Sequence, residues 1–317
     1  MMRLALALLV VVGSVVPAAA QYPDRPVTAI VGYPAGGLAD VTLRALVEGM
    51  KKKFPKGLAV VNRPGAGGSI GASEVIKSKP DGLMFGLMPI SNLVIQPQAL
   101  DLPYKTPDDY IPVINVVSWY PLLAVKADAP WKTAQEFFTA AKANPGKFRV
   151  GTPGEGTSSH LNLEEIKRLA DVNLTHVPFA GWAEGSPALL GGHIEAIVAQ
   201  PGEVRPMVEG KRMRVLGVFA PTRNANFADA PTFKELGQPV HNGASFLLLL
   251  PNGTPAEVVR HVHDTAKAAM DDAAFVGFVK ARVIELDYRA GDKLRADLWQ
   301  EYRAHTEILK RIGMLRQ

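Results

Sequence analysis

Residues 27–50 read VTAIVGYPAGGLADVTLRALVEGM and decide the class of fold. They contain a β-like run at 27–32, the turn Gly36-Gly37 and the start of an amphipathic helix at 39–54. The first N–H groups of a helix have no intrahelical partner and lie at the positive end of its dipole, and glycine lets a ligand approach the backbone closely. The stretch therefore predicts an anion site at the start of a helix.

A second turn of this kind, TPGEGTSSH, occupies residues 152–160. It follows a β-like run at 147–151 and leads into a helix-like run at 158–170. Because the two turns are far apart in the chain, they predict two lobes that close on one small acid.

Strand-like and helix-like runs alternate along both halves of the chain. After the first unit come strands at 58–61 and 83–88 with a helix at 70–78 between them, and a second series starts near residue 121. Such alternation predicts an α/β fold in which mostly parallel sheets are covered by helices on both faces. Ligands of such folds bind near the carboxyl ends of the strands.

Two helix-like runs near the C-terminus, at 256–270 and 294–312, bear on the domain organisation. If they return to the first lobe, lobe 1 comprises residues 21–120 and 241–317, and lobe 2 comprises residues 121–240. The chain then crosses between the lobes near Trp119 and near residues 237–243, and two crossings can form a hinge. Two continuous halves remain the alternative.

Residues 1–20 have the features of a cleavable signal peptide. The basic start MMR precedes an apolar run at 4–16 and three alanines, which predicts cleavage before Gln21. A membrane anchor is the alternative, but the run is shorter than the ~20 residues that span a bilayer. The absence of cysteine excludes disulfides, cysteine-ligated metals and a lipid-modified cysteine. We therefore expect a soluble protein exported to the periplasm.

Composition describes an ordinary globular chain of 317 residues, 47% hydrophobic and 21% charged, long enough for about two domains. The formal net charge of +5 is mild and helps to gather anions. Lysine and arginine are scattered, and the one dense run, Lys51-Lys52-Lys53, lies at a predicted helix end, where cations stabilise the dipole. We therefore expect no nucleic-acid partner.

A hydrolase is an alternative, in which Ser159 would be the nucleophile and His160 the base. Adjacent helical residues point in different directions, and no G-x-S-x-G elbow surrounds the serine. His160 and Glu164 share a helical face, but two ligands are too few for a metal site and no H-E-x-x-H pattern exists. The glycines of 65–71 lack the G-x-G-x-x-G spacing of dinucleotide sites. The sequence thus predicts no catalytic residue, no metal and no cofactor.

Ordered motifs along the mature chain resemble those of the tripartite tricarboxylate transporter substrate-binding proteins, also called Bug receptors. The motifs are YPDRPV at 22–27, YPAGG at 33–37, NRPGAGG at 62–68, PDG at 80–82, GTPG at 151–154, SSHL at 158–161, THVPF at 175–179 and LLGG at 189–192. This many motifs at compatible spacing are highly specific evidence for the family, whereas any one glycine pair would be weak evidence.

This resemblance implies a type II-like periplasmic binding protein, whose two α/β lobes are joined by a hinge and close over a small organic acid. The implied ligand is a di- or tricarboxylate, an amino acid or an aromatic acid, and the implied partner is a membrane permease or a sensor protein. We expect a monomer. The resemblance assigns a carboxylate to two loops, made of Tyr33, Pro34, Ala35, Gly36 and Gly37 in the first and Thr152, Gly154, Gly156, Thr157, Ser158 and Ser159 in the second.

The chemistry of these residues agrees with that assignment. Backbone N–H groups and hydroxyls can satisfy a carboxylate without an arginine, and Thr157, Ser158 and Ser159 supply both. Helix N-capping is the alternative, and it alone would account for one of the three. Asp40 is a further candidate, although we expect it to orient the first loop or its own helix start rather than to touch an anion.

Residues that follow predicted strands are candidates for contacts with the far end of the ligand, with packing as the alternative. They are Ser91, Asn92, Phe179, Gly181, Trp182 and Gln200. Ala180 stands where the family commonly has a lysine, and Ala199-Gln200-Pro201 replaces a more usual acidic and serine-containing stretch. The aromatic residues and the lost charge suit a less polar or aromatic acid as well as a dicarboxylate.

Overall fold

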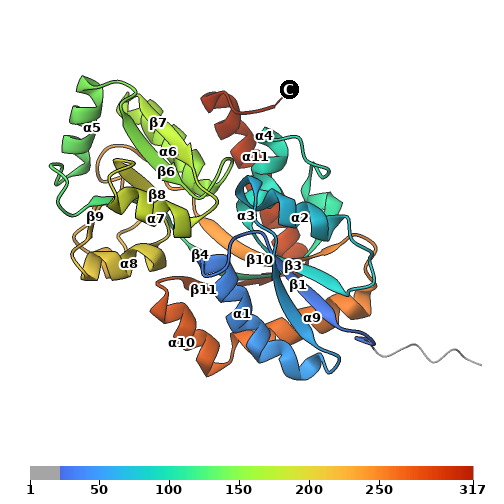
Figure 1. Cartoon of the computed structure of the whole chain (residues 1–317). Coiled ribbons are helices and arrows are strands. Elements are labelled where there is room, and N and C mark those ends of the chain that lie inside the picture. Colours follow the sequence, from blue (N-terminus) through green and yellow to red (C-terminus); the bar gives the residue numbers. More distant parts are fainter. Residues whose placement is uncertain (1–21, 317) are drawn as a thin grey trace, which may run out of the picture.

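A computed structural model describes residues 22–316, so the predicted signal peptide, residues 1–20, lies outside the described residues. The chain forms two β-sheets, each flanked by helices (Figure 1). Within residues 22–316, no helix has both the length and the apolar character that crossing a membrane requires.

The first sheet has six strands in the order β11-β4-β10-β3-β1-β2. Strand β1 pairs in parallel with β2 and β3, whereas β10 is antiparallel to β3 and β4, and β11 is antiparallel to β4. Four strands therefore run in one direction and two oppose them. The strands are β1 (Val27–Val31), β2 (Leu58–Asn62), β3 (Met84–Pro89), β4 (Tyr110–Trp119), β10 (Ala244–Pro251) and β11 (Glu285–Ala290).

Alternation along β1 explains how both faces of this sheet are covered. Val27, Ala29 and Val31 belong to one buried apolar cluster, while Ile30 points to the other face and joins a second cluster. Helices α1 (Leu38–Met50), α9 (Ala256–Met270) and α10 (Ala273–Ala281) cover the first face. The second face packs against α2 (Ser69–Ile76), α3 (Ile90–Val94), α4 (Gln96–Ala99) and α11 (Gly291–Ile312).

The second sheet has five strands in the order β7-β6-β8-β5-β9. They are β5 (Leu122–Lys126), β6 (Phe148–Thr152), β7 (Leu174–Pro178), β8 (Ala196–Ala199) and β9 (Met213–Val218). Only β5 runs against the other four. Helices α5 (Ala134–Ala143) and α6 (Ser158–Ala170) pack on one face, and α7 (Trp182–Leu190) and α8 (Pro201–Glu209) pack on the other.

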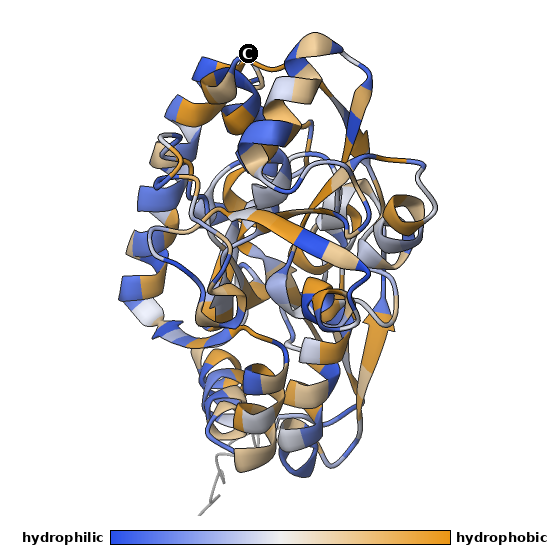
Figure 2. Cartoon of the chain, turned by 90° about the vertical axis from the view of Figure 1, so that its left-hand side faces the viewer, coloured by the Kyte–Doolittle hydropathy of each residue, from blue (hydrophilic) through white to orange (hydrophobic). Residues whose placement is uncertain are grey.

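The prediction of two α/β sheets flanked by helices is confirmed, with one refinement: both sheets are mixed, because β5, β10 and β11 run against the other strands of their sheets. Strands β5 and β10 are each the first strand after the chain passes from one sheet to the other, through residues 120–121 and 219–243. In Figure 2 the strands are mainly hydrophobic in colour, while the outer helices alternate between hydrophobic and hydrophilic positions. Such alternation is expected of helices that bury one face.

Sequence analysis missed two strands of the first sheet. The run YIPVINVVSW forms β4, which is almost wholly buried, and ELDYRA forms the edge strand β11. Strand β4 ends at Trp119 and β5 begins at Leu122, so a link of two residues joins the sheets at this crossing. At the other crossing, the Asn162 side chain on α6 accepts a hydrogen bond from the N–H of Asn242 at 3.0 Å.

Candidate functional site

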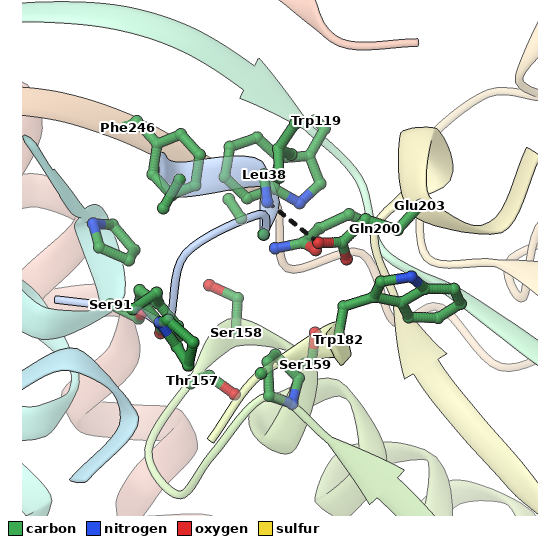
Figure 3. A pocket seen from close by; sticks show the side chains of 18 of the residues that line it. Leu38, Ser91, Trp119, Thr157, Ser158, Ser159, Trp182, Gln200, Glu203 and Phe246 are labelled. Carbon is green, nitrogen blue, oxygen red and sulfur yellow. Dashed lines mark hydrogen bonds between the residues drawn. The ribbon is translucent and has the colours of Figure 1, made fainter. Parts of the chain in front are cut away.

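A cavity lies between the two sheets and takes its lining from both (Figure 3). The elements of the first sheet contribute Tyr33, Pro34, Gly37, Leu38, Ala39, Pro89, Ser91, Trp119, Ala244 and Phe246, and those of the second contribute Pro153, Thr157, Ser158, Ser159, Gly181, Trp182, Ala183, Gln200 and Glu203.

The first glycine loop brings the start of α1 to the cavity. Gly37 precedes the helix as its N-cap and supplies no side chain to its N–H groups. Gly36 has a φ of 84°, a conformation that glycine adopts readily. Its N–H is not free to bind a ligand, because it donates to Asp40 Oδ2 at 2.9 Å.

Asp40 holds this loop from behind the cavity and does not line it. Its buried carboxylate also accepts hydrogen bonds from Asn62 Nδ2 and Arg44 Nε, both at 2.9 Å. Burial alone would raise the pKa of Asp40, but the hydrogen bonds from Arg44, Gly36 and Asn62 hold it below its usual value. The arrangement fits a role in orienting the loop.

The second glycine loop presents the start of α6. Thr157 is the N-cap: its Oγ1 accepts the His160 N–H at 3.2 Å and donates to the Gly154 carbonyl at 2.9 Å. The backbone N–H groups of Ser158 and Ser159 have no acceptor within residues 22–316. They lie at the positive end of the helix dipole and line the cavity.

The hydroxyl of Ser158 is the most unusual polar group in the cavity. Its Oγ is buried and has no hydrogen-bond partner in the described part of the chain, and the residue as a whole is 3% exposed. Figure 3 shows Ser158 and Ser159 reaching from α6 toward the side of the cavity formed by Leu38 and Glu203. A buried hydroxyl without a partner is costly, so its position indicates a ligand that supplies one.

Aromatic rings form much of the remaining wall. Trp119, the last residue of β4, packs on Phe246 of β10 with ring centroids 4.5 Å apart. Tyr33 donates its hydroxyl to the Gly67 carbonyl at 2.7 Å, which fixes the ring, and Trp182 opens α7. A ligand in this cavity therefore meets apolar surface over much of its length.

Glu203 is the only acidic or basic side chain among the described residues that line the cavity. It lies in the first turn of α8, and its Oε1 accepts the backbone N–H of Leu38, the first residue of α1, at 3.2 Å (Figure 3). Burial raises the pKa of Glu203 to about 8, although hydrogen bonds from the Leu38 and Gln200 backbone and the charge of Arg282 act in the opposite direction.

The predicted site residues fall into two groups. The structure brings together around the cavity Tyr33, Pro34, Gly37, Ser91, Thr157, Ser158, Ser159, Gly181, Trp182 and Gln200. The other predicted residues do not line the cavity, and two of them, Ala35 and Gly36, are exposed; they are Ala35, Gly36, Asp40, Asn92, Thr152, Gly154, Gly156 and Phe179.

The second group supports the loops. Asn92 donates to the Gly67 carbonyl at 2.8 Å, and Thr152 Oγ1 donates to the Gly154 carbonyl at 3.1 Å. The ring of Phe179 packs against Gly151, so closely that a Cβ on Gly151 would lie 2.9 Å from the ring. These residues act through the shape of the loops rather than by lining the cavity.

The histidines next to the second loop also have structural partners. His160 Nδ1 accepts the Gly156 N–H at 3.2 Å, and its Nε2 lies 3.6 Å from Glu164. The His160 ring stacks on His176, with centroids 3.8 Å apart. Both ring nitrogens of His160 thus face groups other than Ser159, and no cluster of three potential metal ligands occurs within residues 22–316.

Sequence reasoning missed several lining residues and placed Trp119 at the hinge without assigning it to the site. The missed residues are Leu38, Ala39, Pro89, Pro153, Ala183, Glu203, Ala244 and Phe246. A signal for Glu203 does exist, because proline followed by an acid just after a strand is typical of a helix start. No comparable signal shows which face of β10 borders the cavity.

Comparisons with known proteins agree with this architecture. A family model described as "Tripartite tricarboxylate transporter family receptor" matches residues 42–314. The "UPF0065 protein in gbd 5'region" of Cupriavidus necator is 37% identical over 80% of this chain and 78% of its own length. The solved periplasmic binding protein BugD is 26% identical with a TM-score of 0.87, over 93% of this chain and 100% of its own. MatC of Rhodopseudomonas palustris, solved with bound malate, shares the fold at 24% identity, with a TM-score of 0.85 over 91% of this chain and 100% of its own.

Proposed function

The chain belongs to the tripartite tricarboxylate transporter receptor family of periplasmic solute-binding proteins, and from this premise we propose that it captures a small carboxylate between its two sheets. The observation that carries the proposal is the hydroxyl of Ser158 at the start of α6, which is buried and finds no hydrogen-bond partner among residues 22–316. A carboxylate oxygen is the acceptor that this hydroxyl lacks.

The ligand carboxylate is held at the N-terminus of α6. It accepts hydrogen bonds from the backbone N–H groups of Ser158 and Ser159 and from the Ser158 hydroxyl, and the helix dipole favours its charge. Hydrogen bonds to a charged acceptor are stronger than those between neutral groups, so no arginine is needed.

Hydrogen bonds join the two sides of the cleft. Gln96 Nε2 on α4 donates to the Glu155 carbonyl of the second loop at 2.9 Å, and Leu38 donates to Glu203. Arg311 of α11 also donates to Glu165 of α6 at 2.7 Å. A ligand favours closure only through its differential contacts with the shut form.

The biological role that we propose is reversible binding, in which the ligand undergoes no reaction. The protein is exported by a cleavable signal peptide, acts as a monomer in the periplasm, and delivers its ligand to a membrane permease of the tripartite tricarboxylate type or to a sensor protein. Malate bound to MatC supports a carboxylate as the ligand class. The position of His160, turned toward Gly156 and Glu164, argues against a serine hydrolase.

The proposal is tested by identifying the small molecule that co-purifies with the protein. Native mass spectrometry should detect a bound mass, and the released compound should be an organic acid that rebinds to the emptied protein unchanged. Turnover of that compound during incubation, or a ligand without a carboxylate, would contradict the proposal.

A further inference from the structure

The charge balance of the cavity bears on which acid it accepts. Among the described lining residues there is no lysine, arginine or histidine, and Glu203 is the only acid. The N-terminus of α6 offers roughly half a positive charge, which is enough for one carboxylate. A second carboxylate would meet no cation among these lining residues, and the positive charge of Arg282 already acts on Glu203. A buried charge without a partner is unfavourable.

Glu203 also makes a contact outside its own helix. Its Oε1 reaches across the cavity to the Leu38 N–H at 3.2 Å, so the carboxyl group occupies the start of α1, the first of the two anion sites that the sequence predicts. An acid supplied by the protein thus stands where a ligand's second acid would otherwise find N–H donors. Figure 3 shows it facing the cavity between Leu38 and Trp182.

The aromatic wall complements this single acid. Trp119, Phe246, Tyr33 and Trp182 surround the same space as Glu203. Aromatic faces attract cations, and rings combined with one carboxylate form a site suited to an ammonium group. The negative faces of the rings repel an anion, and the carboxyl group of Glu203 does so in its ionised form.

We infer that Glu203 determines the specificity of the cavity and selects a zwitterion, an acid with one carboxylate at α6 and an ammonium group at its other end. The inference rests on the proposed function, because it presupposes the carboxylate at Ser158. An ammonium beside Glu203 favours its ionised form. Since burial raises the pKa of Glu203 to about 8, binding near neutral pH releases a proton.

Three linear acids of equal chain length separate the possibilities. They are 6-aminohexanoate, hexanoate and adipate, which end in an ammonium, a methyl and a second carboxylate. Titration calorimetry near neutral pH should give the tightest binding for 6-aminohexanoate, with adipate about tenfold weaker or more. In Glu203→Gln this preference should disappear. The control Glu209→Gln, at the exposed far end of α8, should retain it.

The outcomes distinguish this inference from the proposed function. If 6-aminohexanoate binds no more tightly than hexanoate or adipate, or if Glu203→Gln keeps the preference, Glu203 does not set specificity, while capture of a carboxylate stands. Calorimetry in buffers of different ionisation enthalpy should show proton release with the wild type but not with Glu203→Gln. If the co-purified compound carries no carboxylate, the proposed function and the inference both fail.

Discussion

Gly67 and Gly154 face each other across the cleft, so closely that a Cβ on Gly154 would lie 2.7 Å from the Cα of Gly67. Both glycines have positive φ angles, 61° and 124°. Gln96 reinforces the contact by donating to the Glu155 carbonyl at 2.9 Å and to the Gly67 carbonyl at 3.3 Å. The two backbones therefore meet with no side chain between them, and the closed form requires glycine at both positions.

Gly154→Ala should weaken ligand binding by about tenfold or more, because the new methyl holds the two loops apart and strains the backbone. Affinity is measured by calorimetry, and small-angle scattering should show a less compact liganded form. Gly192→Ala is the matched control, since Gly192 also has a positive φ, 74°, but a Cβ there meets no atom within 4 Å. If both variants bind the ligand like the wild type, the close contact between Gly67 and Gly154 does not limit closure of the cleft.

Ser158→Ala should lower affinity for the carboxylate by about tenfold to a hundredfold, the value of a hydrogen bond to a charged group. The unliganded protein should be as stable as the wild type or slightly more so, because the removed hydroxyl has no partner within residues 22–316. Thermal unfolding with and without ligand separates the two effects. Ser73→Ala on α2, away from the cavity lining, should change neither quantity. A loss of stability equal to the loss of affinity would show that the hydroxyl is structural.

Glu203→Gln should become progressively more stable than the wild type as the pH rises. Burial raises the pKa of Glu203 from 4.5 to about 8, so the folded protein keeps a proton that the unfolded chain loses. The free energy of unfolding of the wild type therefore declines as the pH rises from the lower to the higher of these two pKa values. The variant has no ionisable group at this position and does not show this decline. Thermal unfolding at about pH 5 and about pH 9 measures the change. An equal difference between the two proteins at both pH values would argue against a raised pKa.

His176→Gln should make the protein less sensitive to acid. Burial, with a contribution from His160, lowers the pKa of His176 from 6.5 to about 3, so the folded protein excludes a proton that the unfolded chain binds. Stability is thus lost as the pH falls from 6.5 toward 3. Denaturant unfolding at several acidic pH values should show a shallower decline for the variant. Parallel declines would mean that His176 does not cause this acid sensitivity.

Much of the fold could be predicted because its signals are local. The helices α6 and α9 begin and end where the periodicity of the sequence predicts, since apolar spacing and caps act within a few residues. The strand β4 was missed, because a continuous apolar run carries no period to identify it. The division into lobes 21–120 with 241–317 and 121–240 remains a prediction, and so does the role of the site residues in binding.

The site was predictable in part for the same reason. Both glycine loops identify helix starts at the cavity, yet no pattern in the sequence indicates that the N–H groups of Gly36 and Gly156 already have acceptors. Those acceptors, Asp40 and His160, lie one helical turn further along the chain. Whether such a side chain folds back on its loop depends on how the helix packs.

By itself, then, the amino-acid order determined the two α/β series, the two helix starts that offer N–H groups and the resemblance to a receptor family. Tertiary structure alone decided that Glu203 meets Leu38 across 165 residues of chain and that Trp119 and Phe246 share one wall. The reason is physical: periodicity and capping depend on neighbours along the chain, whereas the polarity of a cleft depends on which side chains two closing sheets bring together.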